Sequence, residues 1–240
     1  MIDIIQNYWL LLLIGQFPNG PLGGLAMTLI LAACGICLAF PCSIAIALAL
    51  TSPFKSLRTT AQAFVYIVRG LPLLMFIFWA YFAIPALLGT SVPGVITMLF
   101  ALVIYESVYL AEVIRGGIQA LPSGQVEAAR AMGLTHMQTQ RIVILPQVLY
   151  NVLPSILSQF ISTIKETSLG YVISVNELTF AANQVNSILL TRPFDVYLLL
   201  AIIYFTLCFI LTSCVRWLEF RVERGRKSLR VNNQCLPKIP

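Results

Sequence analysis

Five long stretches of the sequence are apolar and carry almost no charge. Two of them hold one charged residue each, Arg69 and Glu106, and the other three hold none. Each stretch is long enough for a helix to cross the roughly 30 Å of hydrocarbon in a bilayer. Because the bilayer core contains no water, every backbone polar group there must be paired within its own helix. The stretches therefore predict five transmembrane helices, at Leu25–Leu50, Ala61–Ile84, Gly94–Ala111, Gln147–Ile164 and Val196–Val215.

The composition agrees with a membrane protein. Of the 240 residues, 59% are hydrophobic and only 10% are charged, a balance that is too apolar for a soluble domain. The two-residue alternation of an outer-membrane barrel is absent from the sequence. We therefore predict an all-α polytopic membrane protein.

The basic residues predict the orientation of the chain. If the loop at residues 121–146 is cytoplasmic, twelve of the 15 Lys and Arg residues lie on the cytoplasmic side. Arg192 alone lies on the outer side, and Arg69 and Lys165 lie within spans. The positive-inside rule then places the N-terminus outside and the C-terminus in the cytoplasm. This asymmetry explains the net charge of +6, so no nucleic-acid partner is expected.

We divide the chain into three segments. Residues 1–24 lack the basic start of a signal peptide and are too short in their apolar part to span, so we expect an interfacial segment on the outer face. Residues 25–217 form a single transmembrane domain of five spans, and residues 218–240 form a basic cytoplasmic tail on anionic membrane lipid. The six cysteines are interpreted as small packing residues and reduced thiols, and we expect no metal site.

The loop between the third and fourth spans carries local signals for two short helices. Ser123 can cap the first helix, and Gly133 suits the left-handed position after its last turn. Thr135 and Gln138 match the capping box that starts a second helix. Pro146 requires this second helix to bend or restart. We therefore predict a rigid helix of roughly 13 Å on the membrane surface.

This loop resembles the Glu-Ala-Ala loop of ABC-transporter permease subunits. In that family a Gly follows the Glu-Ala-Ala after three residues, and Ile-x-Leu-Pro follows after nine more; Val143 replaces the Ile here. The resemblance implies that the helix couples the permease to a separate ATPase. The alternative is an ordinary cytosolic loop helix. The coupling residues implied by the resemblance are Glu127, Ala128, Ala129, Gly133, Leu145 and Pro146.

Polar residues inside the spans mark a second region of interest. Arg69 is followed by Gly70 and Pro72, a combination that we expect to break the helix where it faces protein or water. Glu106 lies about 20 Å along its helix from Pro93, deep enough to require a partner or a wet cavity. A further cluster follows in the fourth span, at Lys165-Glu166-Thr167-Ser168.

We predict a substrate path that includes Arg69, Glu106, Glu166 and Thr167. Arg69 would favour a carboxylate, whereas an ionised Glu106 or Glu166 would favour an ammonium group. Alternative interpretations remain open, because Arg69 can instead extend to the inner surface and the cluster near Glu166 can instead bond the spans together. Glu112 and Arg115 are three residues apart, so we expect a structural ion pair between them.

Three segments resemble the permeases for polar amino acids. They match that subfamily's Arg-Gly-x-Pro-Leu-Leu, its Ala-Glu-x-x-Arg-Gly-Gly-Ile and its Lys-acid-Thr-Ser-Leu, at Val68–Leu74, Ala111–Ile118 and Lys165–Leu169. The resemblance implies the type I ABC importer permease fold, with a coupling helix between spans 3 and 4. It also implies uptake of a polar amino acid, of the acidic or amide type, across a bacterial inner membrane.

The partners expected from this resemblance are an ABC ATP-binding subunit, a second permease subunit, identical or related, and an extracytoplasmic solute-binding protein. The sequence contains no Gly-x-x-x-x-Gly-Lys-Ser/Thr phosphate loop, so we expect ATP to be bound by the partner subunit and no cofactor to be held by this chain. We therefore expect a transport subunit rather than an enzyme.

Two other classes of function could use some of these residues. An ion- or proton-coupled secondary transporter or channel would use the same intramembrane charges, but it leaves the loop at 121–146 without a role and predicts an inverted repeat that we do not find. An intramembrane enzyme would need a base, and His136, the single histidine, has no nearby Ser, Cys or acid pattern that would make it one.

Overall fold

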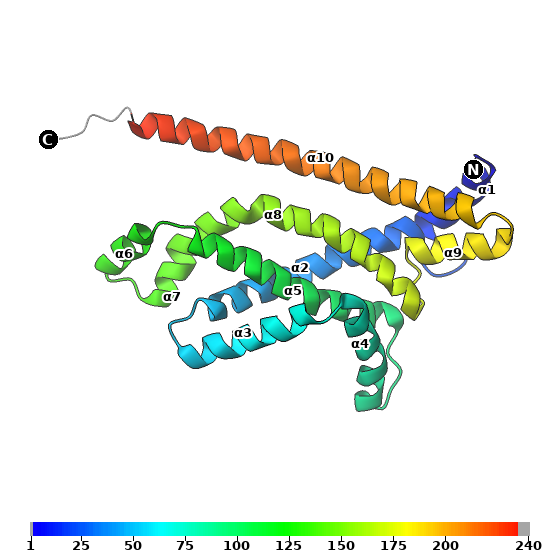
Figure 1. Cartoon of the computed structure of the whole chain (residues 1–240), viewed down its shortest axis with the longest axis horizontal. Helices are drawn as coiled ribbons and strands as arrows, with labels where there is room; N and C mark the ends of the chain where they lie inside the picture. The colour runs from blue at the N-terminus through cyan, green and yellow to red at the C-terminus, as the bar shows by residue number, and fades with distance from the viewer. Residues whose placement is uncertain (1, 235–240) are drawn as a thin grey trace.

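The computed structural model describes residues 2–234, with side chains described for residues 3–87 and 89–220. The described chain is almost entirely helical and elongated (Figure 1). Its elements are α1 Ile2–Ile14, α2 Gly24–Leu50, α3 Lys55–Gly70, α4 Leu73–Leu88, α5 Gly94–Gln119, α6 Ser123–Ala131, α7 His136–Gln138, the π-helix η1 Thr139–Ile144, α8 Leu145–Glu166, the 3₁₀ helix η2 Thr167–Ile173, α9 Leu178–Leu189 and α10 Pro193–Gln234.

Four continuous helical stretches are long and apolar enough to cross a membrane, and a bent pair of helices accounts for the fifth predicted span. The four are Gly24–Leu50, Gly94–Gln119, His136–Ile173 and Pro193–Phe220. Their lengths confirm the predicted all-α polytopic class. α10 continues as a helix past residue 217, where we placed the start of the basic tail, and the tail's side chains from residue 221 onward lie outside the described part.

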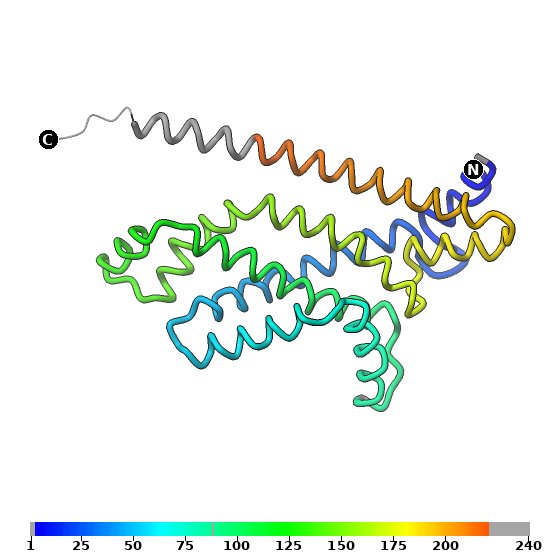
Figure 2. Tube along the Cα trace, viewed as in Figure 1, coloured from blue at the N-terminus to red at the C-terminus, as the bar shows by residue number. Residues whose placement is uncertain are grey.

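The second predicted span is broken into α3 and α4, which meet at an angle of 101° (Figure 2). Pro72 explains the break, because a residue before proline is driven out of the helical region. Leu71 accordingly has φ −101° and ψ 134°, and Pro72 itself has ψ 136°. The predicted interruption after Arg69 is confirmed, and it turns α4 away from the direction of α3.

The centre of the molecule is the packing of α2, α5 and α8. Small residues of α2, Ala39 and Ala47, belong to one buried cluster with larger apolar residues of the other two helices, such as Ile114 and Val148. α5 and α8 are in close contact at Gly117, where an added Cβ would lie 2.6 Å from Val152 Cγ1. Because glycine brings no side chain to this contact, the two helices that flank the loop at 121–146 are in direct contact next to it.

α1 and α9 lie at the end of the molecule opposite α6 and α7 (Figure 1). Glu177 is buried at the start of α9, where its carboxylate oxygens accept hydrogen bonds from the backbone N–H groups of Thr179 (2.7 Å) and Phe180 (2.9 Å). Tyr204 of α10 donates to the same carboxylate at 3.2 Å. Burial raises the pKa of Glu177 from 4.5 to about 7.

Candidate functional site

α6 is closed at its C-terminal end by a Schellman motif. Gly133 N donates to Arg130 O at 2.9 Å and Leu134 N donates to Ala129 O at 3.2 Å. Gly133 has φ +85°, the left-handed conformation predicted for it. At the other end, the predicted Ser123 cap is wrong. Pro122 takes the cap position in an extended conformation, no side chain caps the helix, and Ser123 is already its first residue.

The two faces of α6 differ. Ala129 is buried against other residues of the same polypeptide, with 1% of its surface exposed, whereas Glu127 and Ala128 are exposed. The helix is thus held on one side by its own chain and presents the first two residues of the Glu-Ala-Ala triplet outward. Gly133 and Pro146 are exposed, and Leu145 is buried in the core of α2, α5 and α8.

The second helix of the loop starts as predicted and then changes from an α-helix to a π-helix. Thr135 and Gln138 form the expected capping box, with Thr135 N donating to Gln138 Oε1 at 2.9 Å. The next turn, Thr139–Ile144, is a π-helix, which continues directly into α8. Pro146 explains the change, because its ring and missing N–H disturb the α-helical turn before it, and the wider turn accommodates both. The predicted bend is therefore a π-helical turn rather than an interruption.

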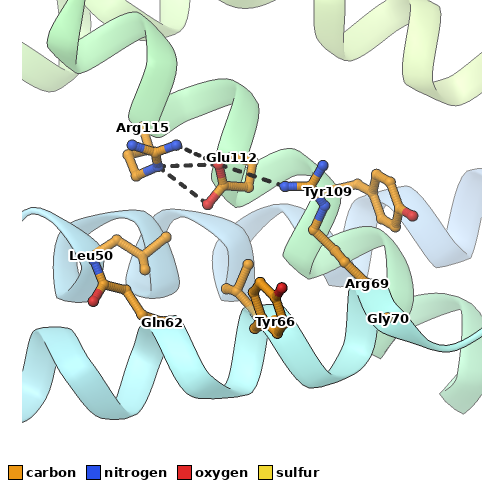
Figure 3. Close-up of a pocket in the computed structure, with 9 residues that line it drawn as sticks. Leu50, Gln62, Tyr66, Arg69, Gly70, Tyr109, Glu112 and Arg115 are labelled. Atoms are coloured by element: carbon orange, nitrogen blue, oxygen red, sulfur yellow. Dashed lines mark hydrogen bonds and ion pairs between the residues drawn. The ribbon is translucent and has the colours of Figure 1, made fainter.

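Arg69 lines an open cavity of about 810 Å³ between α3 and α5 (Figure 3). Its guanidinium lies 5.4 Å from the ring centre of Tyr109 and 3.8 Å from Glu112 Oε2. Glu112 is held more tightly by Arg115, whose Nη2 donates to the same oxygen at 2.6 Å. The expected Glu112–Arg115 pair is confirmed. One carboxylate here faces two guanidinium groups, so the cavity keeps positive charge.

Glu106 has the partners that its depth requires. It is fully buried on α5 and accepts hydrogen bonds from Thr163 Oγ1 at 2.7 Å and Gln159 Nε2 at 2.9 Å, both on α8. Glu166 is close enough to interact electrostatically with it, and one carboxylate oxygen of Glu166 is buried without a hydrogen-bond partner among the described residues. Thr167 is buried and donates to Ile164 O in its own helix.

The four predicted path residues therefore fall into two places. Arg69 lies in the cavity, Glu106 and Glu166 lie on α5 and α8, which contact each other, and Thr167 follows as the first residue of η2. Tyr105 and Tyr109 stand between the two places, with their hydroxyl oxygens 3.1 Å apart. Tyr109, Gln159 and Thr163 were not predicted from the sequence. The spacing of Tyr105, Tyr109 and Glu112 on one helix face was visible, but the helix opposite that face was not.

α8 also carries an exposed polar face. Its side chains are spaced alternately four and three residues apart, so that they lie along one side of the helix. The face ends at Lys165, the last residue but one of α8, within the apolar stretch His136–Ile173. Lys165 is exposed, and the ion pairs among the described side chains do not include it. The members of this α8 polar face are Asn151, Ser155, Ser158, Ser162 and Lys165.

The family profile described as "Binding-protein-dependent transport system inner membrane component" matches residues 39–224. The chain belongs to this family. The match covers the loop at 121–146 and all of the predicted path residues. Membership confirms the predicted resemblance and the prediction of a membrane transport subunit rather than an enzyme.

Two curated relatives illustrate the family. The inner membrane amino-acid ABC transporter permease protein YhdY of Escherichia coli is 37% identical over 208 residues, covering 85% of this chain and 57% of that protein. The chain thus spans little more than half the length of YhdY. The probable glutamine ABC transporter permease protein GlnM of Bacillus subtilis is 35% identical over 202 residues, covering 84% of this chain and 93% of that protein.

A solved structure agrees with the fold. The crystal structure of an amino acid ABC transporter with histidines has a TM-score of 0.75 and 35% sequence identity, and it covers 82% of this chain and 92% of that one. The predicted importer-permease fold is thereby confirmed for this member of the inner membrane component family.

Proposed function

We propose that the chain is the permease subunit of an ATP-driven importer that moves a polar amino acid, of the acidic or amide type, across the inner membrane. The observation that carries this proposal is the geometry of α6, which buries Ala129 and exposes Glu127 and Ala128. A helix fixed on one face and free on the other is suited to a partner's groove. Family membership and the names of the two relatives support the same function.

Coupling follows from how α6 is attached. Its Schellman motif and Ala129 join it to the segment that leads into α8, and the short turn at Ala120–Pro122 joins it to α5. Closure of an ATP-binding subunit on α6 would therefore displace α5 and α8 relative to the other spans. Glu106 bonds these two helices to each other, so the displacement reaches the middle of the membrane.

In the proposed orientation an imported substrate would reach Arg69 last among the predicted path residues, because Arg69 lies beside Glu112 toward the inner end of α5. About half of the Arg69 side chain is exposed, and its single carboxylate neighbour is already held by Arg115. An incoming α-carboxylate or side-chain carboxylate would replace water around this guanidinium. Thr167, Glu166 and Glu106 would come earlier on the way in, with Glu166 available to an ammonium group.

The proposed transporter contains three further kinds of protein. An ABC ATP-binding subunit would supply ATP hydrolysis at α6. A second permease subunit, a copy or a relative, would cover the α8 polar face, because exposing Lys165 to lipid is costly. A solute-binding protein would dock at the opposite end, near α1 and α9. We place the N-terminus outside and the C-terminus inside, on the distribution of basic residues.

The test replaces residues of the coupling helix in the reconstituted complex. We expect Gly133→Val to abolish transport without removing the protein from the membrane, because a β-branched residue is strained at φ +85°. Glu127→Lys should do the same by reversing the charge presented to the ATPase. Ser123→Ala is the matched control, since Ser123 makes no cap bond, and it should transport at the wild-type rate.

Transport at the wild-type rate by either variant would refute the coupling role of α6. Solute movement by the purified chain alone, without nucleotide or a companion subunit, would instead support a secondary transporter.

A further inference from the structure

A groove of about 540 Å³ lies between the end of α2, the start of α3 and the segment α7–η1. We call it the inner-loop groove, because it joins the first inner loop to the loop at 121–146. It is separate from the cavity at Arg69 and from the exposed face of α6. Residues that define it include Leu48, Ala49, Phe54, Leu57, Met137 and Gln140.

The floor of the groove is apolar and lies partly within a membrane span. Leu48 and Ala49 belong to the last turn of the α2 span, which ends at Leu50. Phe54 and Leu57 follow just beyond it, and Phe54 leaves 71% of its surface exposed. The groove therefore crosses the boundary between the hydrocarbon and the inner membrane surface, with its apolar residues on both sides of that boundary.

Among the described residues, the groove has one arginine or lysine in its lining, the exposed Arg141. Lys55 and Arg58 neighbour the lining residues Phe54 and Leu57 in the chain, but they line a separate cavity with Arg115. The two segments that form the rim, residues 51–60 and 134–142, contain no Asp or Glu. A guanidinium in the groove without a counter-ion in either segment, with further positive charge near it, favours an anionic partner.

One polar group in the wall lacks a partner. Gln140 has only 6% of its surface exposed, and its Oε1 has no hydrogen-bond partner among the described residues. A buried acceptor of this kind is costly unless a donor reaches it. The occupant of the groove should therefore carry a hydrogen-bond donor close to its negative charge.

We propose that the inner-loop groove binds an anionic phospholipid of the inner leaflet whose headgroup carries hydroxyl donors, such as phosphatidylglycerol. The acyl chain would lie against Leu48 and Ala49, the phosphate at Arg141, and a headgroup hydroxyl at Gln140. This inference rests on the proposed orientation, which places the groove at the cytoplasmic surface. A purely aqueous partner would leave the part of the groove inside the span uncovered.

The position of the groove links lipid to coupling. Its wall includes Thr135 and His136, which begin the helix that runs from the coupling loop into α8. A lipid bound there would hold α7 against the first inner loop.

The test uses the full chain in nanodiscs, with a fluorescent reporter in the groove. The three native tryptophans are replaced by phenylalanine and Phe54→Trp is introduced, so that brominated lipid quenches only the groove signal. We expect brominated phosphatidylglycerol to quench at a lower mole fraction than brominated phosphatidylcholine, which lacks both net charge and headgroup donors. Arg141→Gln should weaken this preference about five-fold, the factor expected from roughly 1 kcal/mol per basic residue at an anionic surface.

Arg216→Gln is the matched control, because it removes an exposed basic residue near the end of the last span without touching the groove. It should leave the preference unchanged. Equal quenching by the two lipids, or an equal effect of Arg216→Gln and Arg141→Gln, would overturn the proposal. So would displacement of the lipid signal by an added ATP-binding subunit, which would assign the groove to that partner. The assay contains neither nucleotide nor substrate, so failure of transport alone would count only against the proposed function.

Discussion

Glu106 is a buried residue that joins two helices, α5 and α8, in the interior of the molecule. It is a carboxylate without solvent contact, and its two hydrogen-bond donors both come from α8. Leaving a buried polar group unpaired costs about 1–3 kcal/mol. Removing the carboxylate leaves Gln159 Nε2 without this acceptor, whereas Thr163 Oγ1 can still donate to Gln159 O at 3.0 Å. A carboxylate in such a place can also serve transport, and the two roles predict different behaviour for two substitutions.

Glu106→Leu should destabilise the protein, because Gln159 loses its acceptor inside the helix contact. Glu106→Gln should be close to neutral for stability, because Gln159 can turn its amide and Thr163 can still donate to the new side chain. Thermal unfolding in detergent measures this difference. If Glu106 also belongs to the path, Glu106→Gln will lose substrate-stimulated ATPase activity at unchanged stability. Unchanged stimulation would remove Glu106 from the path.

Glu177 provides a prediction about pH. Its folded-state pKa of about 7 is above the ordinary 4.5, so its contribution to stability is complete below about pH 4.5 and is lost as pH rises through 7. The shift corresponds to roughly 3 kcal/mol. Melting temperatures should therefore fall between pH 5 and 7 in the wild type. Glu177→Gln, which cannot ionise, should show a smaller fall over the same range, and parallel curves would contradict the assignment.

At the scale of elements, the sequence predicted where helices begin, end and break, but not how the helices are oriented relative to one another. The capping box at Thr135, the left-handed Gly133 and the break at Pro72 each depend on neighbours in the chain, and all three were predicted. The 101° angle between α3 and α4 depends on packing against other helices. Pro146 predicted that its helix must bend or restart, but not that a π-helical turn would accommodate it. Ser123 failed as a cap because Pro122 beside it already had the extended conformation that the position needs.

The candidate site shows the same division. Arg69 and Glu106 were identified because charges inside apolar runs are conspicuous in sequence. Their partners were not, because Gln159 and Thr163 lie more than 50 residues from Glu106, and only the tertiary contact of α5 with α8 brings them together. The roles of the predicted path residues stay predictions.

At the scale of the whole molecule, the single chain leaves surfaces that a membrane would not cover. The α8 polar face runs along a span with serines at regular spacing, and it ends at the exposed Lys165. Lipid offers these groups no hydrogen bonds, whereas a second permease subunit and the water between the two would. Glu166 follows Lys165, at the edge of this face. A path between two subunits would therefore pass the carboxylates of Glu106 on α5 and Glu166 on α8.

This assembly predicts which side of α8 meets water. In a chain lacking the six native cysteines, Ser158→Cys should react readily with a water-soluble maleimide in the assembled transporter. Leu153→Cys is the matched control, because Leu153 is also exposed on α8 but on the opposite side of the helix, and it should react slowly since it faces lipid. If the partner is a second copy, oxidation should also join two Ser158→Cys chains into a dimer. Equal reaction rates at the two positions would mean that α8 does not line a water-filled path.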